Sequence, residues 1–428
     1  MKKRLLVIVM MCLAFIGLNA QASKAAEVDI LINKLVEKKI ITQDEATQLI
    51  ADMAKEGPRE NAEIKTIVAE AAKEEAKNNK QVLPSWVQNM TISGDFRTRY
   101  QTEDVSNDGL PSRDRWRIRL RTGVESKIND QWKVGFGFAT GGGSDGSDPI
   151  SRNQTLENEF QAPSLRVDYA YAQYTPNKNV TIMAGKFKNP LWTTKDLIWD
   201  GDANPDGLAA TFNFKASDKI NFFITPAYFI LEEDKASKND PAMIAIQPGM
   251  NWKINDSVNL KVAGAYYDNM NVKGSDMSLW SQGTNSRDSN KKWIYDLSST
   301  AFEAEASFKL PFFLKNASLF GEHIKSDADT DNTGWLAGIK LGDEKVKELG
   351  QWQFIYNYRN LEKDGWVDWL PDSDFYNGKT GVKGSEYELT FGLRKNVTFG
   401  LDYYADQPIV NLSNKNMKVL QVDLVVKF

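Results

Sequence analysis

Residues 113–125, "RDRWRIRLRTGVE", decide the fold of this chain because charged and apolar side chains alternate along them. Residues two apart in a β-strand share one face. If this segment is a strand, one face carries a row of guanidinium groups and the other carries hydrocarbon. The charged row is Arg113, Arg115, Arg117, Arg119 and Arg121, and the apolar row is Trp116, Ile118 and Leu120. The fold must therefore offer water to one face and an apolar medium to the other.

The same alternation recurs from residue 90 to the last residue. It is clear in "SVNLKVAGAYYD" at 257–268, in "EYELTFGLRK" at 386–395 and in "KVLQVDLVVKF" at 418–428. Segments of about 10 residues with a period of two predict half-buried strands. We predict sixteen of them, of which 317–326 has an ambiguous phase. Their ranges are 91–101, 115–126, 132–139, 165–175, 180–188, 207–214, 220–231, 242–254, 257–268, 301–310, 317–326, 333–341, 352–361, 385–394, 397–406 and 418–428.

The connections between these segments alternate between short and long. Such alternation is typical of an up-and-down meander with one smooth rim and one elaborated rim. The links at 326–331 and 342–350 deviate mildly from the rule. The clearest short links are 128–130, 176–179, 216–219, 255–256 and 395–396, and the clearest long ones are 140–164, 189–206, 269–300 and 362–384.

A meander of sixteen strands would expose two sheet edges unless it closed on itself. A closed barrel of this size holds more volume than side chains fill, so its interior is aqueous. The charged faces then point inward and the apolar faces meet lipid. We therefore predict an all-β fold: a transmembrane up-and-down antiparallel β-barrel of about 16 strands, spanning residues 86–428.

This partition fixes the phase of the opening segment. An arginine on the lipid face costs about 2–4 kcal/mol at the bilayer midplane, so four in one strand must face the lumen. Two arginines of the preceding strand share the inward phase. We predict that these side chains form a pore-lining basic wall, which consists of Arg97, Arg99, Arg115, Arg117, Arg119 and Arg121.

Aromatic residues gather toward the predicted strand ends. Membrane barrels carry girdles of such residues at the two water–lipid interfaces. We assign to these girdles Trp116, Trp132, Tyr169, Tyr171, Trp252, Tyr266, Trp335, Trp352, Tyr356, Tyr358 and Tyr403.

Residues 1–22 are predicted to be a signal peptide. A basic start, "MKKR", precedes an apolar run, and "AQA" ending at Ala22 fits a cleavage site. Removal of this segment lowers the formal charge from −4 to −7 and removes Cys12, the chain's one cysteine. The remaining chain then has no disulfide, and its acidic balance argues against nucleic acid as a partner.

Residues 23–85 differ from the rest of the chain. They are rich in Ala, Glu and Lys, with apolar residues at helical spacing and a capping box at Thr42 and Glu45. We predict a helical periplasmic segment. Two interpretations stay open: a solvated spacer, or a self-associating segment whose residues 27–80 contact the cell wall.

Several of these features together resemble the "putative porin" family of Gram-negative outer-membrane proteins and the general plan of 16-stranded bacterial porins. They are the signal peptide, the helical "LVEKKIITQDEA", the segment 185–207 "GKFKNPLWTTKDLIWDGDANPDG" and the terminal Phe428. The resemblance implies an outer-membrane location surrounded by lipid and a homotrimer. It also implies that Phe428 is an assembly signal for the barrel-assembly machinery.

In porins the long connection after the fifth strand folds into the barrel. Here that connection, 189–206, carries four acidic residues, with Trp192 and Trp199 as candidate anchors against the wall. The acids could narrow the pore opposite the basic wall, which would set a transverse field. They could instead only tether the loop, or bind a divalent cation, since Asn204 and two glycines lie among them. The four acids are Asp196, Asp200, Asp202 and Asp206.

The sequence argues against an enzyme. His323 is the single histidine, and nucleophile elbows, phosphate loops and zinc spacings do not occur. We predict a porin that lets small hydrophilic solutes and ions diffuse passively, with no cofactor and no metal. A substrate-specific, anion-preferring channel and a barrel-anchored tether between outer membrane and cell wall remain alternatives.

Overall fold

A computed structural model gives the structure, and it describes residues 42, 44–48, 84–106, 109–141, 148–235, 238–277, 279–311, 314–409 and 415–428. The chain divides into two units, Met1–Pro84 and Ser85–Phe428. The predicted signal peptide and most of the predicted helical segment lie outside the described residues. In the first unit, residues 44–48 are helical. The Thr42 amide donates to Glu45 Oε2 at 2.8 Å, and the Glu45 amide donates to Thr42 Oγ1 at 3.3 Å, as a capping box requires.

The second unit is built almost entirely of strands. A short helix, α5 (Ser85–Gln88), precedes them, and one turn of 3-10 helix, η1 (Tyr376–Gly378), lies in a late loop. The strands are β1 (Met90–Val105), β2 (Arg113–Lys127), β3 (Trp132–Thr140), β4 (Gln154–Thr155), β5 (Leu165–Asn177), β6 (Val180–Lys186), β7 (Asp206–Lys215), β8 (Ile220–Ile230), β9 (Ala242–Lys253), β10 (Val258–Met270), β11 (Ser299–Lys309), β12 (Asn316–Ser326), β13 (Thr333–Gly342), β14 (Trp352–Leu361), β15 (Val382–Arg394), β16 (Val397–Pro408) and β17 (Met417–Lys427). All sixteen predicted strands are confirmed, and β4 is an addition of two residues.

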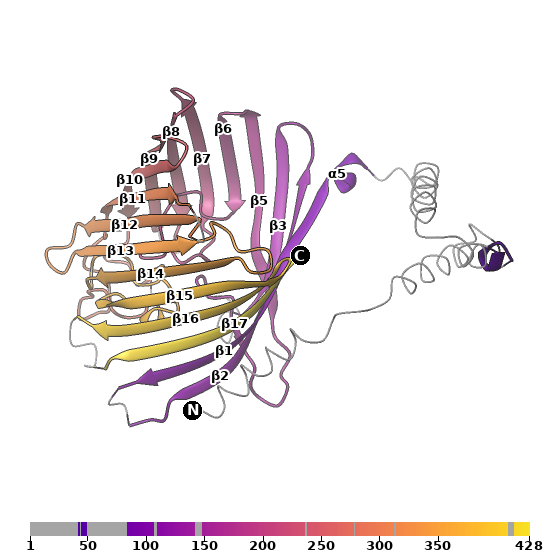
Figure 1. Cartoon of the computed structure of the whole chain (residues 1–428). Coiled ribbons are helices and arrows are strands. Elements are labelled where there is room, and N and C mark those ends of the chain that lie inside the picture. Colours follow the sequence, from indigo (N-terminus) through magenta and orange to yellow (C-terminus); the bar gives the residue numbers. More distant parts are fainter. Residues whose placement is uncertain are drawn as a thin grey trace. The chain divides into compact units, whose positions relative to one another are not determined.

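The sheet closes into a barrel. Each long strand pairs antiparallel with the next along the chain, and β1 pairs with both β2 and β17 (Figure 1). Phe428 extends this closing seam, because its amide donates to the Gly94 carbonyl at 3.0 Å and its carbonyl oxygen accepts from the Gly94 amide at 2.9 Å. The two-residue β4 pairs with Arg117 and Ile118 of β2, beyond Arg121, where the pairing of β2 with β3 ends. Loop residues thus lengthen the wall next to the arginines.

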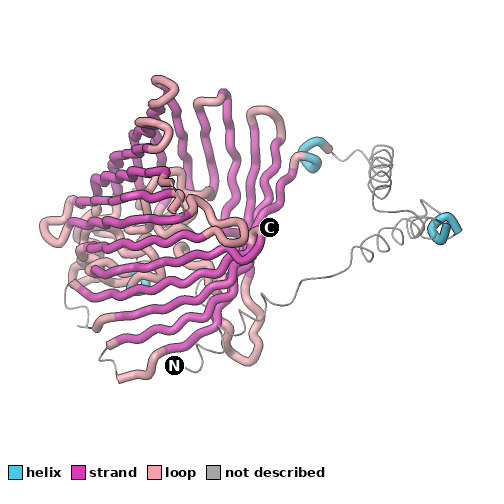
Figure 2. The backbone as a smooth tube through the Cα atoms, in the orientation of Figure 1, coloured by secondary structure: helices cyan, strands magenta, loops and turns pink. Residues whose placement is uncertain are grey.

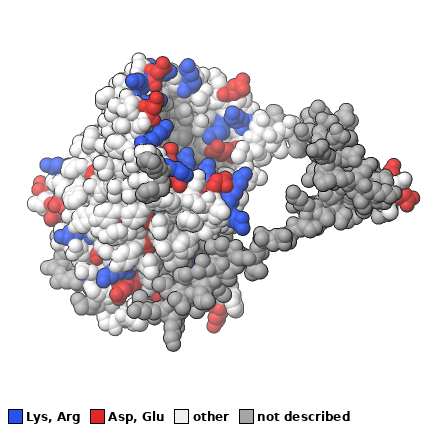
Figure 3. All heavy atoms as spheres, viewed as in Figure 1, with Lys and Arg blue, Asp and Glu red and all other residues white. Residues whose placement is uncertain are grey.

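The outward faces form the predicted apolar band. Large side chains such as Ile92, Phe302 and Leu319 are 66%, 55% and 56% exposed in this isolated chain. In Figure 3 the wall that faces the viewer is mostly uncharged, and charged atoms gather toward its edges. Leu319 also settles the ambiguous strand, because it places the odd-numbered residues of β12 outside. Among the described helices, none has the length and apolar character needed to span a membrane.

Two of the predicted girdle residues face inward instead. Tyr171 donates its hydroxyl to Glu125 at 2.7 Å, and the ring of Tyr169 lies over Gly123 and Gly137 of the inner wall. The cause is a β-bulge, since Gly137 pairs with Tyr169 while Phe138 pairs with Val167. One extra residue in β5 reverses the inward or outward direction of every later side chain in that strand. We did not predict this bulge from the alternation of residues.

The main apolar cluster lies inside the barrel. The connection 187–205 enters the lumen, and its Trp199 packs against Tyr267 of β10 and Trp366 of the connection 362–381, with ring centroids 6.3 and 6.1 Å apart. Trp366 Nε1 donates to the Ile198 carbonyl at 2.7 Å. Figure 2 shows such loops in pink, behind the strands of the wall. Two loops far apart in the sequence therefore share one core within the lumen.

The partition of faces makes a prediction for β11. Ala304 shares the outward phase of Phe302 near the middle of the strand, and Ser307 shares the inward phase. We expect Ala304→Arg to destabilise the folded barrel by about 2–4 kcal/mol, because the guanidinium meets lipid. Urea titration of refolding into lipid vesicles measures this loss. Ser307→Arg is the matched control, and an equal loss in both variants would refute the assignment of faces.

Candidate functional site

The basic wall consists of the inward arginines of β1 and β2. These strands are paired so that Arg97 lies opposite Arg119, and Arg99 opposite Arg117. Like charges directly opposite each other repel, so this arrangement needs carboxylates among the guanidiniums. Its members are Arg97, Arg99, Arg115, Arg117, Arg119 and Arg121.

Neighbouring strands supply part of the negative charge. Arg99 makes a bidentate pair with Asp423 of β17, at 2.7 and 2.8 Å. Asp95 of β1 pairs with both Arg119 and Arg121, at 3.0 and 2.8 Å. Two further carboxylates, Glu103 of β1 and Asp402 of β16, lie 2.7 Å from Arg115 and 3.8 Å from Arg99. The wall is therefore a mixed ionic network.

Two infolded loops supply the remaining carboxylates. Asp202 of the connection 187–205 lies 2.9 Å from Arg121 and 4.0 Å from Arg119. Asp374 of the connection 362–381 lies 2.8 Å from Arg99 and 3.9 Å from Arg117. Burial alone would raise the pKa of Asp374, but the adjacent guanidiniums outweigh burial and hold that pKa well below its usual value. Asp374 therefore stays ionised in moderately acidic solution.

The other three predicted loop acids lie away from the basic wall. Asp196 pairs with Arg359 of β14 at 2.9 Å, and Asp206 pairs with Lys186 at the rim at 2.8 Å. Asp200 accepts the Ser373 amide at 2.8 Å and the Asp202 amide at 2.7 Å, which joins the two infolded loops. Burial and the nearby Asp202 raise the pKa of Asp200 well above its usual value. These three acids therefore pair with groups outside the basic wall.

Both tryptophans of the first loop contact the wall. Trp199 lies in the central apolar cluster described above. The backbone of Trp192 exchanges two hydrogen bonds with the Gln247 side chain of β9, at 2.8 and 2.7 Å. The Lys261 ammonium of β10 lies 4.3 Å from the centre of the Trp192 ring. The loop is thus held at two points on β9 and β10, across the barrel from the basic wall.

A second ionic cluster surrounds Arg359. Its guanidinium contacts Asp196, Asp372 at 3.3 Å and Glu386. The oxygens of these three acids lie within 4.8 Å of one another, as metal ligands would. The buried Arg359 guanidinium and the Lys195 ammonium, which lies 3.2 Å from Asp196 and 3.3 Å from Glu386, already supply positive charge to the three acids, so the arrangement fits an ionic cluster better than a metal centre. The acids predicted as an alternative cation site, Asp200, Asp202 and Asp206, turn to three different partners.

The connection 362–381 also enters the lumen, which we did not predict from its residues. Its stretch "DGWVDWLPDSDF" at 364–375 mixes two tryptophans with four aspartates. That composition is the same signal that marked 189–206 as an infolded loop. We also did not predict Asp95, Asp423 and Arg359 as site residues, because cross-strand partners depend on the register of the strands.

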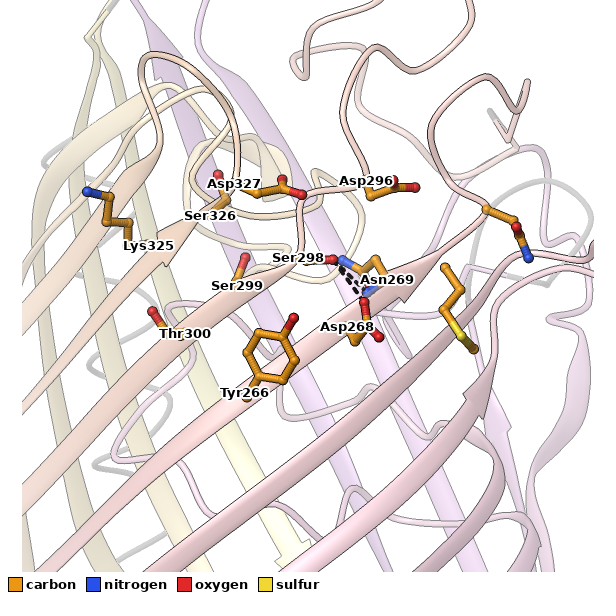
Figure 4. A pocket seen from close by; sticks show the side chains of 12 residues that line it. Tyr266, Asp268, Asn269, Asp296, Ser298, Ser299, Thr300, Lys325, Ser326 and Asp327 are labelled. Atoms are coloured by element: carbon orange, nitrogen blue, oxygen red, sulfur yellow. Dashed lines mark hydrogen bonds between the residues drawn. The ribbon is translucent and has the colours of Figure 1, made fainter.

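One hollow adjoins the basic wall. It has about 600 Å³, lies between the wall and the first loop, and is lined by Asp95, Arg121, Lys188 and Asp202 among others. Another, of about 740 Å³, lies away from the basic wall, at the long-loop rim of β10–β12 (Figure 4). There the Ser298 hydroxyl links Asp268 and Asn269. The first hollow is lined by charged groups, as an aqueous lumen requires.

Comparison with known proteins identifies the family. The profile described as "Putative porin" matches residues 58–111, 104–304 and 295–428. The chain belongs to the "putative porin" family. Its family and its barrel fold are those of an outer-membrane porin channel. No curated protein matches the chain.

Solved porin structures resemble the fold of this porin. OprB of Pseudomonas putida, in a high-pH structure, has a TM-score of 0.52 at 10% identity and covers 80% of this chain and 95% of its own. OmpF of Salmonella typhi in complex with daunomycin has a TM-score of 0.47 at 12% identity, over 79% of this chain and 97% of its own. A triple mutant of Rhodopseudomonas blastica porin has a TM-score of 0.43 at 11% identity, and the match covers 79% of this chain and 100% of the mutant porin. The likeness to OprB shows a shared barrel fold.

Proposed function

We propose that this porin lets small hydrophilic solutes and ions diffuse through a charged lumen that is narrowed by two loops. One observation carries the proposal: the basic wall faces Asp202 and Asp374 on infolded loops, beside a polar hollow of about 600 Å³. Fixed charges of both signs beside an aqueous passage create local fields that orient polar solutes.

The charge balance favours a weakly selective pore over an anion-preferring one. Six guanidiniums of the wall lie within 4.0 Å of six carboxylates: Asp95, Glu103, Asp202, Asp374, Asp402 and Asp423. Arg117 is the least neutralised, since its nearest carboxylate, Asp374, is 3.9 Å away. Selectivity therefore depends on single charges at the wall.

We expect Asp374→Asn and Arg117→Ser to shift ion selectivity in opposite directions. Loss of the carboxylate favours anions and loss of the guanidinium favours cations, by about fivefold in permeability ratio if about 1 kcal/mol of electrostatic energy is removed. The reversal potential of the purified protein in a planar bilayer under a salt gradient measures the ratio. Asp206→Asn, on the exposed rim pair, is the control. Unchanged selectivity in both variants would place the wall off the permeation path.

We further propose that the protein acts as a homotrimer and inserts by way of the barrel-assembly machinery. The family membership supports the first proposal, and the position of Phe428 on the closing seam supports the second. Chemical crosslinking in native membranes tests the trimer. The tether alternative is separable, because deletion of residues 27–80 would release the cell wall and leave conductance intact.

A further inference from the structure

A separate cavity of about 350 Å³ lies at the long-loop rim, above the adjoining ends of β6, β7 and β8. Five connections contribute to it: 141–164, 187–205, 231–241, 271–298 and 362–381. It lies on the other side of the Trp199 cluster from the basic wall, and none of the wall arginines lines it. Its size falls at the lower end of small-molecule sites.

The lining is mainly apolar and includes three tryptophans. Trp199, Trp280 and Trp369 come from three different loops, and Phe229 of β8 and Met277 are among the other apolar residues. Trp199 and Phe229 are buried and pack edge to face, with centroids 5.8 Å apart. Trp280 and Trp369 are half-buried and so remain available to a solute. Aromatic faces carry negative potential and attract cations.

Two charged side chains at the edge of the cavity differ in whether an opposite charge pairs with them. The Lys186 ammonium is held by Asp206 at 2.8 Å and by the Asn204 carbonyl at 2.9 Å, so its charge is matched. Glu232 lines the cavity, and within the described part of the chain no cation pairs with its carboxylate. Burial, together with the carboxylates of Asp276, Asp234 and Asp240, raises the pKa of Glu232, which shows that its surroundings are acidic.

We propose that this cavity binds an amphipathic organic cation: an amine or quaternary ammonium group joined to an apolar body. The tryptophan surfaces would receive the body and the cationic head, and Glu232 would supply the opposing charge. An inorganic cation does not fit, because one carboxylate in an apolar setting does not replace a hydration shell. An anion would meet the acidic rim. Free diffusion of hydrophilic solutes needs no such site, so this binding is an additional property.

Block of the ionic current tests the proposal with benzyltrimethylammonium as the probe and benzenesulfonate as its anionic counterpart. The full-length protein is inserted in a planar bilayer, and each probe is added to one side at a time. We expect the cation to block from the long-loop side. Trp280→Ala should weaken the block about tenfold and Glu232→Gln about fivefold.

The controls are Trp335→Ala, on the lipid-facing wall, and Glu344→Gln, on the short-turn rim. They should leave the block unchanged. Equal block by benzenesulfonate, block that survives both Trp280→Ala and Glu232→Gln, or absence of both block and binding by titration in a conducting protein would each overturn the proposal. A protein that does not conduct would instead refute the proposed pore. Isothermal titration of the same variants in detergent with benzyltrimethylammonium gives the affinity without any current.

Discussion

Replacing Trp199 with alanine should destabilise the barrel by about 3–5 kcal/mol and raise its single-channel conductance. The side chain is 5% exposed and contacts Phe229, Tyr267 and Trp366. Removing a large buried aromatic group costs both its transfer free energy and the energy of the cavity left behind. Because this contact holds the connection 187–205 in the lumen, its loss frees the loop to leave the passage. Urea titration in vesicles and planar-bilayer recording measure the two effects.

Trp335→Ala is the matched control, because that tryptophan faces lipid and is 41% exposed. It should leave conductance unchanged. Unchanged conductance in Trp199→Ala, together with the expected loss of stability, would show that the other contacts of the loop, such as the two hydrogen bonds to Gln247, suffice to hold it. A gain in conductance in both variants would point to a general loosening of the barrel.

The fold was readable from the sequence because the bilayer imposes one rule on every strand. Four arginines in alternate positions of 115–121 admit only one orientation, and β-strand geometry then fixes the faces of the neighbouring strand. The rule is weaker in β12, whose inward face mixes Glu322 with the buried Phe320 and Ile324, so the sequence left its phase ambiguous. It fails at Tyr169 and Tyr171, where a bulge adds one residue to β5. Bulges leave no trace in the alternation of a single sequence.

The candidate site was readable only in part, for the same reason. The arginines belong to the alternating strands, so their inward position followed from the pattern. Their loop partners have no periodicity. Asp200 bonds to Ser373, 173 residues away, and Asp374 reaches Arg99, 275 residues away. Such pairs depend on how two loops pack against each other inside a closed barrel, and composition shows only that both loops are rich in tryptophan and aspartate.

Replacing Arg359 with methionine should have the second large effect. We expect it to lower the free energy of unfolding of the barrel by about 3–5 kcal/mol. Methionine keeps an unbranched but shorter side chain and removes the charge. The three carboxylates then stay adjacent in a buried setting with one guanidinium fewer, although Lys195 still lies 3.2 Å from Asp196 and 3.3 Å from Glu386. Breaking one side of a buried ionic cluster leaves uncompensated charge, and that cost exceeds the value of the pairs. Since two of the acids belong to the infolded loops, their repulsion should also make the current noisier.

A second substitution distinguishes charge repulsion from lost packing. In the double variant Arg359→Met with Glu386→Gln, one negative charge is gone, so we expect part of the stability to return. Arg359→Lys should be less stable than the wild type, because an ammonium group does not reproduce the forked contacts of a guanidinium. The measurement is again urea titration in vesicles, paired with recordings of current noise. If Glu386→Gln deepens the loss instead, the three carboxylates are not in repulsion, and the cluster holds the loops by hydrogen bonding rather than by charge balance.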